Sequence, residues 1–169
     1  MAFDAFLQIP GVSGESTDAQ HKGWIELQEY AFGFEMAVND TRSDSGSPAT
    51  GRVKVNEFTA KKKIDAASAP LMLLVASGKL FDATKSSDDI VVELFRATGT
   101  KELYATIKLK GGIFTKLDIS GSGDELPSED LAISAGEFDF CYQQYSKEGK
   151  KVAQKGMKWS QFTNSGSNY

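Results

Sequence analysis

The side chains best suited to chemistry in this chain of 169 residues are its single histidine and single cysteine, His21 and Cys141. A Ser-His-Asp or Cys-His mechanism would have to be built around His21. His21 follows a polar segment between two apolar runs, where a hydrogen-bonding role that fixes a turn is the commoner use of such a residue. One His and one Cys far apart do not supply the three or four ligands of a zinc site. The sequence therefore predicts no enzyme, no metal and no cofactor.

Acidic residues occur as sequence neighbours near strand or loop ends, at Asp88-Asp89, Asp124-Glu125 and Glu129-Asp130. A glycosidase needs two carboxylates held across a cleft, and adjacency in sequence does not provide that geometry. The segment from Gly121 to Asp124 resembles a phosphate loop only superficially, because no GK[ST] and no βαβ pattern follow it. These carboxylates are expected to be solvated surface charge.

Lysines gather in the run 61–63 and in a second set near the C-terminus, which consists of Lys147, Lys150, Lys151, Lys155 and Lys158. The formal net charge of the whole chain is nevertheless -4, which disfavours a nucleic-acid partner. The lysines therefore indicate a solubilising rim or a charge-matched contact between subunits.

The sequence also bears on where the protein folds. One cysteine cannot form an intramolecular disulfide, so no oxidising compartment is required. The start lacks the basic and apolar regions of a signal peptide, and no run of about 18 apolar residues would span a membrane. We expect cytoplasmic folding and no membrane insertion. Any export would proceed without a classical signal peptide.

Most of the chain alternates apolar and polar residues with a period of two, which predicts an all-β protein of antiparallel strands. The alternation is clear over 103–110 and again over 113–119. Because Gly111-Gly112 lies between these runs and permits a tight turn, we expect the two to pair as a hairpin.

Three strands change the phase of their alternation, which a regular strand cannot do without turning apolar side chains to the wrong face. The changes fall at Gln28-Glu29, between Val55 and Phe58, and around Gly136. Each implies a bulge or a sharp bend. Bent strands favour a closed antiparallel β-barrel over a flat sandwich.

A single short α-helix is expected to flank this barrel. Ser68 is a candidate N-cap, and Gly78 can end the helix in a left-handed conformation. An apolar stripe for docking on the sheet is formed by Leu71, Met72, Leu74 and Val75. A long polar segment over 39–51 reads as an extended, exposed loop. No internal repeat or boundary divides residues 1–169, so one domain is expected.

The order of motifs in the chain resembles the Hcp family, the tube proteins of bacterial type VI secretion. The most specific stretch is Phe6-Leu7-Gln8-Ile9 followed by Gly14-Glu15-Ser16, Asp18 and His21, then Ile25, Tyr30 and Phe32-Gly33. Later similarities are Val53-Lys54-Val55 with Phe58 and Lys61, the helix region from Asp65 to Lys79, and a final strand around Trp159.

The resemblance implies a β-barrel subunit that forms a homo-hexameric ring with an open channel. Rings of this family stack into a tube that carries small effector proteins. A contractile sheath drives the tube, tipped by a VgrG-type spike, out of the bacterium. The resemblance thus implies a structural protein, cytoplasmic during assembly and then secreted to the medium or to a target cell. With no extension after Tyr169, we expect a plain tube subunit without a fused toxin domain.

Individual roles also follow from the resemblance. The loop 40–51 falls where the family has an extended loop that reaches an adjacent ring, which implies a stacking role for Asp40, Arg42, Ser43, Asp44, Ser45, Gly46, Ser47 and Pro48. On the second strand, alternation places Tyr30, Phe32 and Phe34 in the barrel core. The opposite face, with Glu29, Ala31 and Gly33, would then border the channel.

Two other classes of protein remain as alternatives. A monomeric β-barrel that binds a sugar or a lipid would share the strand pattern, and a hydrolase centred on His21 would use the only histidine. Sedimentation or light scattering separates a ring of six subunits from either monomer.

Overall fold

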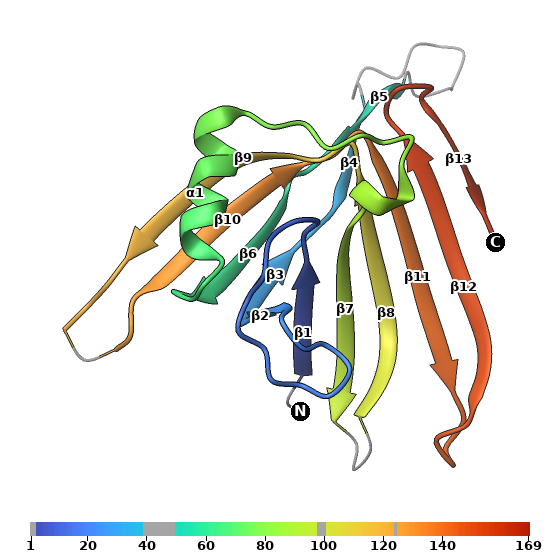
Figure 1. Ribbon diagram of the computed structural model, residues 1–169. Coiled ribbons are helices and arrows are strands. Elements are labelled where there is room, and N and C mark those ends of the chain that lie inside the picture. Colours follow the sequence, from blue (N-terminus) through green and yellow to red (C-terminus); the bar gives the residue numbers. More distant parts are fainter. Residues whose placement is uncertain (1–2, 39–49, 98–100, 124) are drawn as a thin grey trace.

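The computed structural model describes residues 3–38, 50–97, 101–123 and 125–169 (Figure 1). Its elements, in chain order, are β1 (Phe3–Gln8), β2 (Ile25–Leu27), β3 (Glu29–Ala31), β4 (Phe34–Val38), β5 (Thr50–Val55), β6 (Phe58–Lys63), α1 (Ser68–Ser77), the 3-10 helix η1 (Ser86–Asp88), β7 (Ile90–Ala97), β8 (Lys101–Lys110), β9 (Ile113–Ser120), β10 (Ser128–Ser134), β11 (Glu137–Tyr145), β12 (Lys151–Ser160) and β13 (Ser165–Asn168). The prediction of a mainly β protein with one short α-helix is confirmed.

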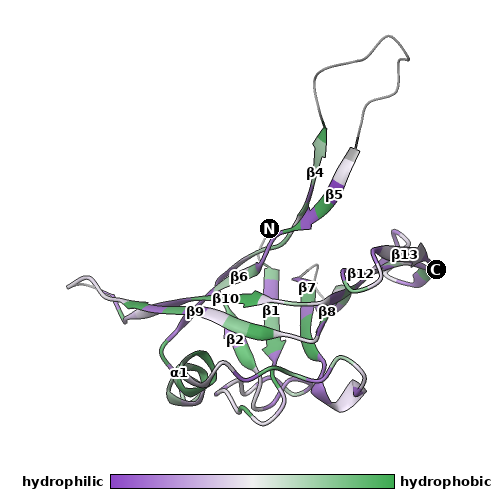
Figure 2. Ribbon diagram, turned by 90° about the horizontal axis from the view of Figure 1, so that it is seen from above, coloured by the Kyte–Doolittle hydropathy of each residue, from purple (hydrophilic) through white to green (hydrophobic). Residues whose placement is uncertain are grey.

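The strands form three hydrogen-bonded groups. A seven-stranded sheet has the order β13-β12-β11-β8-β7-β1-β2, and a four-stranded sheet has the order β3-β6-β10-β9. Among the described residues, strands β4 and β5 pair only with each other, and this ribbon projects away from both sheets (Figure 2). Within the described ranges, neighbouring strands pair antiparallel throughout.

The hydrophobic core lies between the two sheets and extends under α1. Alternate residues of the strands supply it, among them the fully buried Leu7, Phe58, Leu109 and Ile133. Apolar side chains therefore fill the space between the sheets, as expected where period-two strands turn one face inward.

The predicted bends coincide with breaks in the strands. Gln28 separates β2 from β3, residues 56–57 separate β5 from β6, and residues 135–136 separate β10 from β11. At the first and third breaks the chain leaves one sheet and enters the other. When the chain passes from one sheet to the other, its core-facing positions switch from odd to even residue numbers or the reverse. This switch is the phase change seen in the sequence.

The prediction of a closed barrel is wrong for the described residues, where each sheet is open. The seven-stranded sheet ends at β13 and β2, and the four-stranded sheet ends at β3 and β9. At the bends the chain passes from one sheet to the other, so the bends do not close a single sheet into a barrel. At one corner the amide of Gln28 donates to the carbonyl of Lys61 at 2.7 Å, which links the two sheets.

The predicted hairpin between residues 103–110 and 113–119 is also wrong. Strand β8 pairs with β7 and β11, whereas β9 pairs with β10. Gly111 has a φ of +59°, and a Cβ on Gly112 would lie 2.8 Å from Cδ1 of Ile90. These glycines let the chain cross closely over the core from one sheet to the other, rather than close a two-residue turn.

Helix α1 ends at Gly78 in the left-handed conformation, as predicted, but its N-cap is Ala67 and not Ser68. Leu71 and Leu74 are buried, whereas Met72, which was expected on the same stripe, is 42% exposed. In the described residues no helix combines the length and the apolar character needed to cross a membrane.

Candidate functional site

The face of the four-stranded sheet that points away from the core presents polar and small side chains. Strand register places Glu29, Lys61, Asp130 and Asp118 in one row across β3, β6, β10 and β9. Two inward neighbours of this row, Ala60 and Leu131, are buried. Because side chains alternate between the two faces, the whole row faces away from the core.

A second row lies beside the first and is made of Ala31, Thr59, Ala132 and Lys116. Its small side chains leave a shallow depression of about 280 Å³ that Lys61, Lys116 and Asp130 border. At the hairpin end of the sheet, a third outward row consists of Lys63, Ser128 and Ser120. Among these outward register positions, no apolar side chain is larger than alanine.

The charges on this outward face balance. Its carboxylates are Glu29, Asp118 and Asp130, and its ammonium groups are Lys61, Lys63 and Lys116. Lys116 lies 2.7 Å from Asp118, and this hydrogen bond raises the pKa of the Lys116 ammonium. Three positive and three negative groups give this face no net formal charge.

The residues expected to border the channel lie at the β3 edge of this face. Glu29 and Ala31 are exposed, and Gly33 is half-buried in the segment that leads into β4. The sequence did not single out the rest of the face. Alternation in β6 and β10 could have identified Thr59 and Asp130, but only the strand order shows that they lie beside Ala31 and Glu29.

The three aromatic residues expected in the core are buried to different extents. Tyr30 and Phe32 are half-buried and pack against the core. Phe34 is 39% exposed, although its ring contacts those of Phe32 and Phe138. Phe34 therefore lies at the margin of the core of the single chain, since β4 has already left both sheets for the ribbon.

The expected stacking loop from Asp40 to Pro48 lies outside the described residues. The strands that lead to it, β4 and β5, pair from Phe34↔Val55 to Val38↔Thr50, with a shift of register between Met36 and Val38. In β4 two further side chains, those of Met36 and Val38, are 50% and 52% exposed. The ribbon thus carries apolar side chains away from the body of the molecule (Figure 2).

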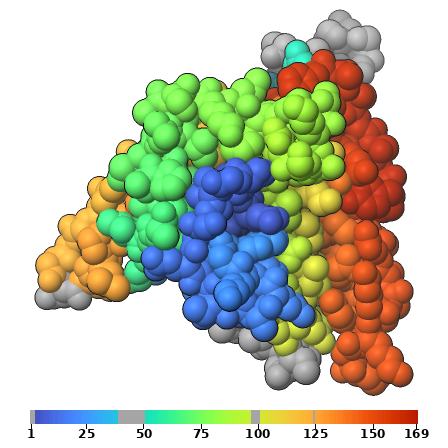
Figure 3. All heavy atoms as spheres, viewed as in Figure 1, coloured from blue at the N-terminus to red at the C-terminus, as the bar shows by residue number. Residues whose placement is uncertain are grey.

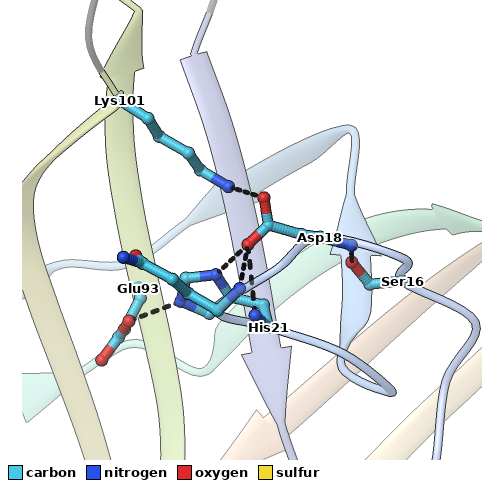
Figure 4. A network of polar contacts seen from close by, with 6 residues as sticks. Ser16, Asp18, His21, Glu93 and Lys101 are labelled. Atoms are coloured by element: carbon cyan, nitrogen blue, oxygen red, sulfur yellow. Dashed lines mark hydrogen bonds and ion pairs between the residues drawn. The ribbon is translucent and has the colours of Figure 1, made fainter.

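His21 lies in a second polar cluster, on the outer side of β1 and β7 (Figure 4). Its Nδ1 lies 2.7 Å from Oδ1 of Asp18, and its Nε2 lies 2.8 Å from Oε2 of Glu93. The imidazole stacks on Phe6 at 4.5 Å between centroids and is 3% exposed. In Figure 3 the N-terminal segment fills the middle of this face, between the α1 region and β7 and β8.

This cluster fits a structural role for His21. A carboxylate oxygen lies within hydrogen-bonding distance of each ring nitrogen, which differs from the nucleophile–histidine–carboxylate order of a hydrolase. Hydrogen bonds from Lys101 and His21 hold the pKa of the Asp18 carboxyl well below its ordinary value. The network therefore ties the loop over residues 14–24 to β7 and β8.

Cys141 is buried in β11 on the face opposite to Tyr142, and its sulfur lies 3.5 Å from Nε2 of Gln143. Among the described residues, no three His, Cys, Asp or Glu side chains are placed to hold a metal ion.

Sequence reasoning also missed a buried ionic cluster at the start of α1. Nζ of Lys62 lies 2.6 Å from Glu129 and 2.8 Å from Asp65, and it donates to Oγ of Ser68 at 3.3 Å. Lys62 and Glu129 are both fully buried. The sequence did contain a signal for this burial. Lys62 follows Phe58 and Ala60 at alternate positions of β6, which places its side chain on the inward face.

Comparison with known proteins identifies one family. The family described as "Type VI secretion system effector, Hcp" matches residues 6–145. Protein hcp1 of Pseudomonas aeruginosa strain PAO1 is 28% identical over 153 residues, which cover 89% of this chain and 90% of that protein.

Solved structures agree in fold. A structure described as that of a type six secretion system protein covers 98% of this chain and 100% of its own, with a TM-score of 0.88 and 25% identity. Hcp1 from Salmonella typhimurium covers 99% and 100%, with a TM-score of 0.75 and 24% identity. The arrangement of two sheets and one flanking helix is therefore shared along nearly the whole chain.

Proposed function

The chain belongs to the Hcp family of type VI secretion proteins, and from this premise we propose that it is a structural subunit of the inner tube. Six copies form a ring, the rings stack, and the central channel carries small effector proteins. A VgrG-type spike and a contractile sheath are the partners that such a tube requires. The protein assembles in the cytoplasm and is then secreted without a classical signal peptide.

The observation that supports a channel most directly is the outward face of the four-stranded sheet. A wall that cargo slides along should not present large apolar side chains, because these would bind exposed apolar surface on the cargo. The face defined by Glu29, Ala31, Lys61, Lys116 and Asp130 meets this requirement and also balances its charge. We assign the channel lining to this face, so that it includes β6, β10 and β9 as well as β3.

The loop from Asp40 to Pro48 is assigned to contacts between stacked rings. The exposed apolar residues at the base of its ribbon support this assignment. A projecting strand with Met36 and Val38 half exposed gains stability when a neighbouring ring covers it.

The two alternatives find less support. A monomeric barrel for a sugar or a lipid needs an enclosed cavity, whereas apolar side chains fill the space between the open sheets. A hydrolase needs His21 to accept a proton from a nucleophile, whereas both ring nitrogens contact carboxylates.

The test is the size and shape of the purified chain. Light scattering at micromolar concentration should give a mass six times the 18.3 kDa of one chain, and negative-stain microscopy should show rings with a central hole. A chain that remains monomeric at every concentration reached would contradict the proposal.

A further inference from the structure

Charge is distributed unevenly between two ends of the molecule. Residues 141–158, which include most of β11 and β12, contain one glutamate and five lysines. We call the five the lysine edge: Lys147, Lys150, Lys151, Lys155 and Lys158, all of them exposed. Lys158 lies 3.8 Å from Asp139, and within the described part of the chain the other four have no ion-pair partner.

The opposite charge collects on the hairpin of β9 and β10. Residues 117–130, which we call the acidic arm, contain five acidic residues and no lysine or arginine, and one of the five, Asp124, lies outside the described residues. Lys62 neutralises Glu129, and Lys116 pairs with Asp118. Glu125 is exposed and Asp130 is half-buried, and neither has an ion-pair partner among the residues that the structure describes.

Both ends also expose apolar side chains. On the acidic arm Ile119 is 47% exposed and Leu126 is 74% exposed. On the lysine edge Tyr142 is 41% exposed and Val152 is 61% exposed. Apolar groups rimmed by complementary charge are typical of surfaces that associate with another protein.

The two ends lie on opposite sides of the molecule. In Figure 1 the β9–β10 hairpin extends to the left and β12 and β13 form the right side, and the same separation is seen from above in Figure 2. One chain cannot bring its own two ends together. Contact between different ends of successive copies is head-to-tail, and such contacts close into a ring when the rotation between copies allows it.

We propose that the lysine edge of one copy binds the acidic arm of the next copy, and that this contact joins neighbouring subunits in the ring. The inference rests on the proposed function and adds the surfaces that meet. Opposite charges fix the direction of the contact, and Ile119 and Leu126 pack beside Tyr142 and Val152 as water is excluded.

Charge reversal tests the proposal. An edge variant, Lys151→Glu with Lys155→Glu, and an arm variant, Asp118→Lys with Glu125→Lys, each place like charges at the contact. Each should weaken association at least about tenfold and shift the mass toward a monomer. A matched control, Lys22→Glu with Lys79→Glu, changes the net charge as much as the edge variant does, at other exposed positions, and should keep the wild-type mass.

Mixing the two variants gives the decisive result. In the mixture each reversed edge can meet a reversed arm, and each native edge can meet a native arm, so rings should form again with alternating copies. A variant that had failed to fold could not be rescued in this way. Wild-type association should also weaken as salt rises, because partly exposed charges are screened.

Two results would overturn the inference. Rings of normal mass from both reversed variants would exclude this contact while leaving the proposed function intact. If the edge variant forms rings of normal mass but no longer binds another protein that the wild type binds, the lysine edge serves that other partner. A wild-type chain that never associates would instead contradict the proposed function itself.

Discussion

At the scale of single residues, the most consequential feature is the burial of Lys62. The run 61–63 looks like solvated charge, and its first and last members do point outward, whereas Lys62 is fully buried. Its partner Glu129 has one oxygen, Oε1, with no hydrogen-bond partner in the described structure. A buried ion pair of this kind tolerates loss of both charges far better than loss of one.

We therefore predict that Lys62→Met destabilises the fold by about 3–5 kcal/mol, because Glu129 is left as an uncompensated buried charge. The double variant Lys62→Met with Glu129→Leu should recover most of that loss. Lys63→Met, at the adjacent exposed position, is the matched control and should change stability by no more than about 0.5 kcal/mol. Urea unfolding of the wild type, Lys62→Met, Glu129→Leu and the double variant measures the cycle, with Lys63→Met as the control. Additive losses in the double variant would show that the two side chains do not act as a pair.

At the scale of elements, the loop over residues 14–24 shows how a segment without regular structure is fixed in place. Its backbone closes on itself through hydrogen bonds from Gly14 to Gly23 at 2.8 Å and from Ser16 to Trp24 at 3.0 Å. His21 then anchors the loop to Asp18 and Glu93. The position of Gly14 is sterically critical, because a Cβ there would lie 2.4 Å from the carbonyl oxygen of Trp24.

Gly14→Ala should thus destabilise the protein by about 1–3 kcal/mol, since backbone atoms must shift to admit the methyl group. The control is Gly123→Ala, where a Cβ would meet no atom within 4 Å. Thermal unfolding of both variants measures the difference. Equal melting temperatures would mean that the loop adapts without cost.

The elements also show what the sequence could predict. The phase changes at Gln28 and Gly136 correctly located the bends, because the parity of apolar residues is a local property. The same pattern did not reveal which strands pair, since β8 and β9 are adjacent in sequence yet lie in different sheets. Pairing depends on contacts between distant segments, such as Glu29 with Lys61, that one sequence does not specify.

At the scale of the whole molecule, the two open sheets leave three surfaces for assembly: the outward face of the four-stranded sheet, the ribbon of β4 and β5, and the pair formed by the lysine edge and the acidic arm. The sequence anticipated part of each, through the alternation around Ala31, the polar loop after Val38 and the lysine set. How the three surfaces lie relative to one another could be seen only from the three-dimensional structure. The outward face shares Asp118 and Asp130 with the acidic arm, so the proposed contact between copies borders the channel wall at β9 and β10.

The last prediction tests that lining. Ala31→Arg puts a long cation on the outward face, so six copies add six positive charges to the channel of a ring. Because Ala31 is exposed at the β3 edge of the sheet, the fold and the ring mass should not change. Passage should become selective: proteins that co-purify with rings from the native bacterium, quantified by mass spectrometry, should shift toward acidic species and fall in total amount. Ala76→Arg, an exposed position on α1, adds the same charge outside the proposed channel and serves as the control. Equal co-purified protein for the two variants would remove Ala31 from the channel wall.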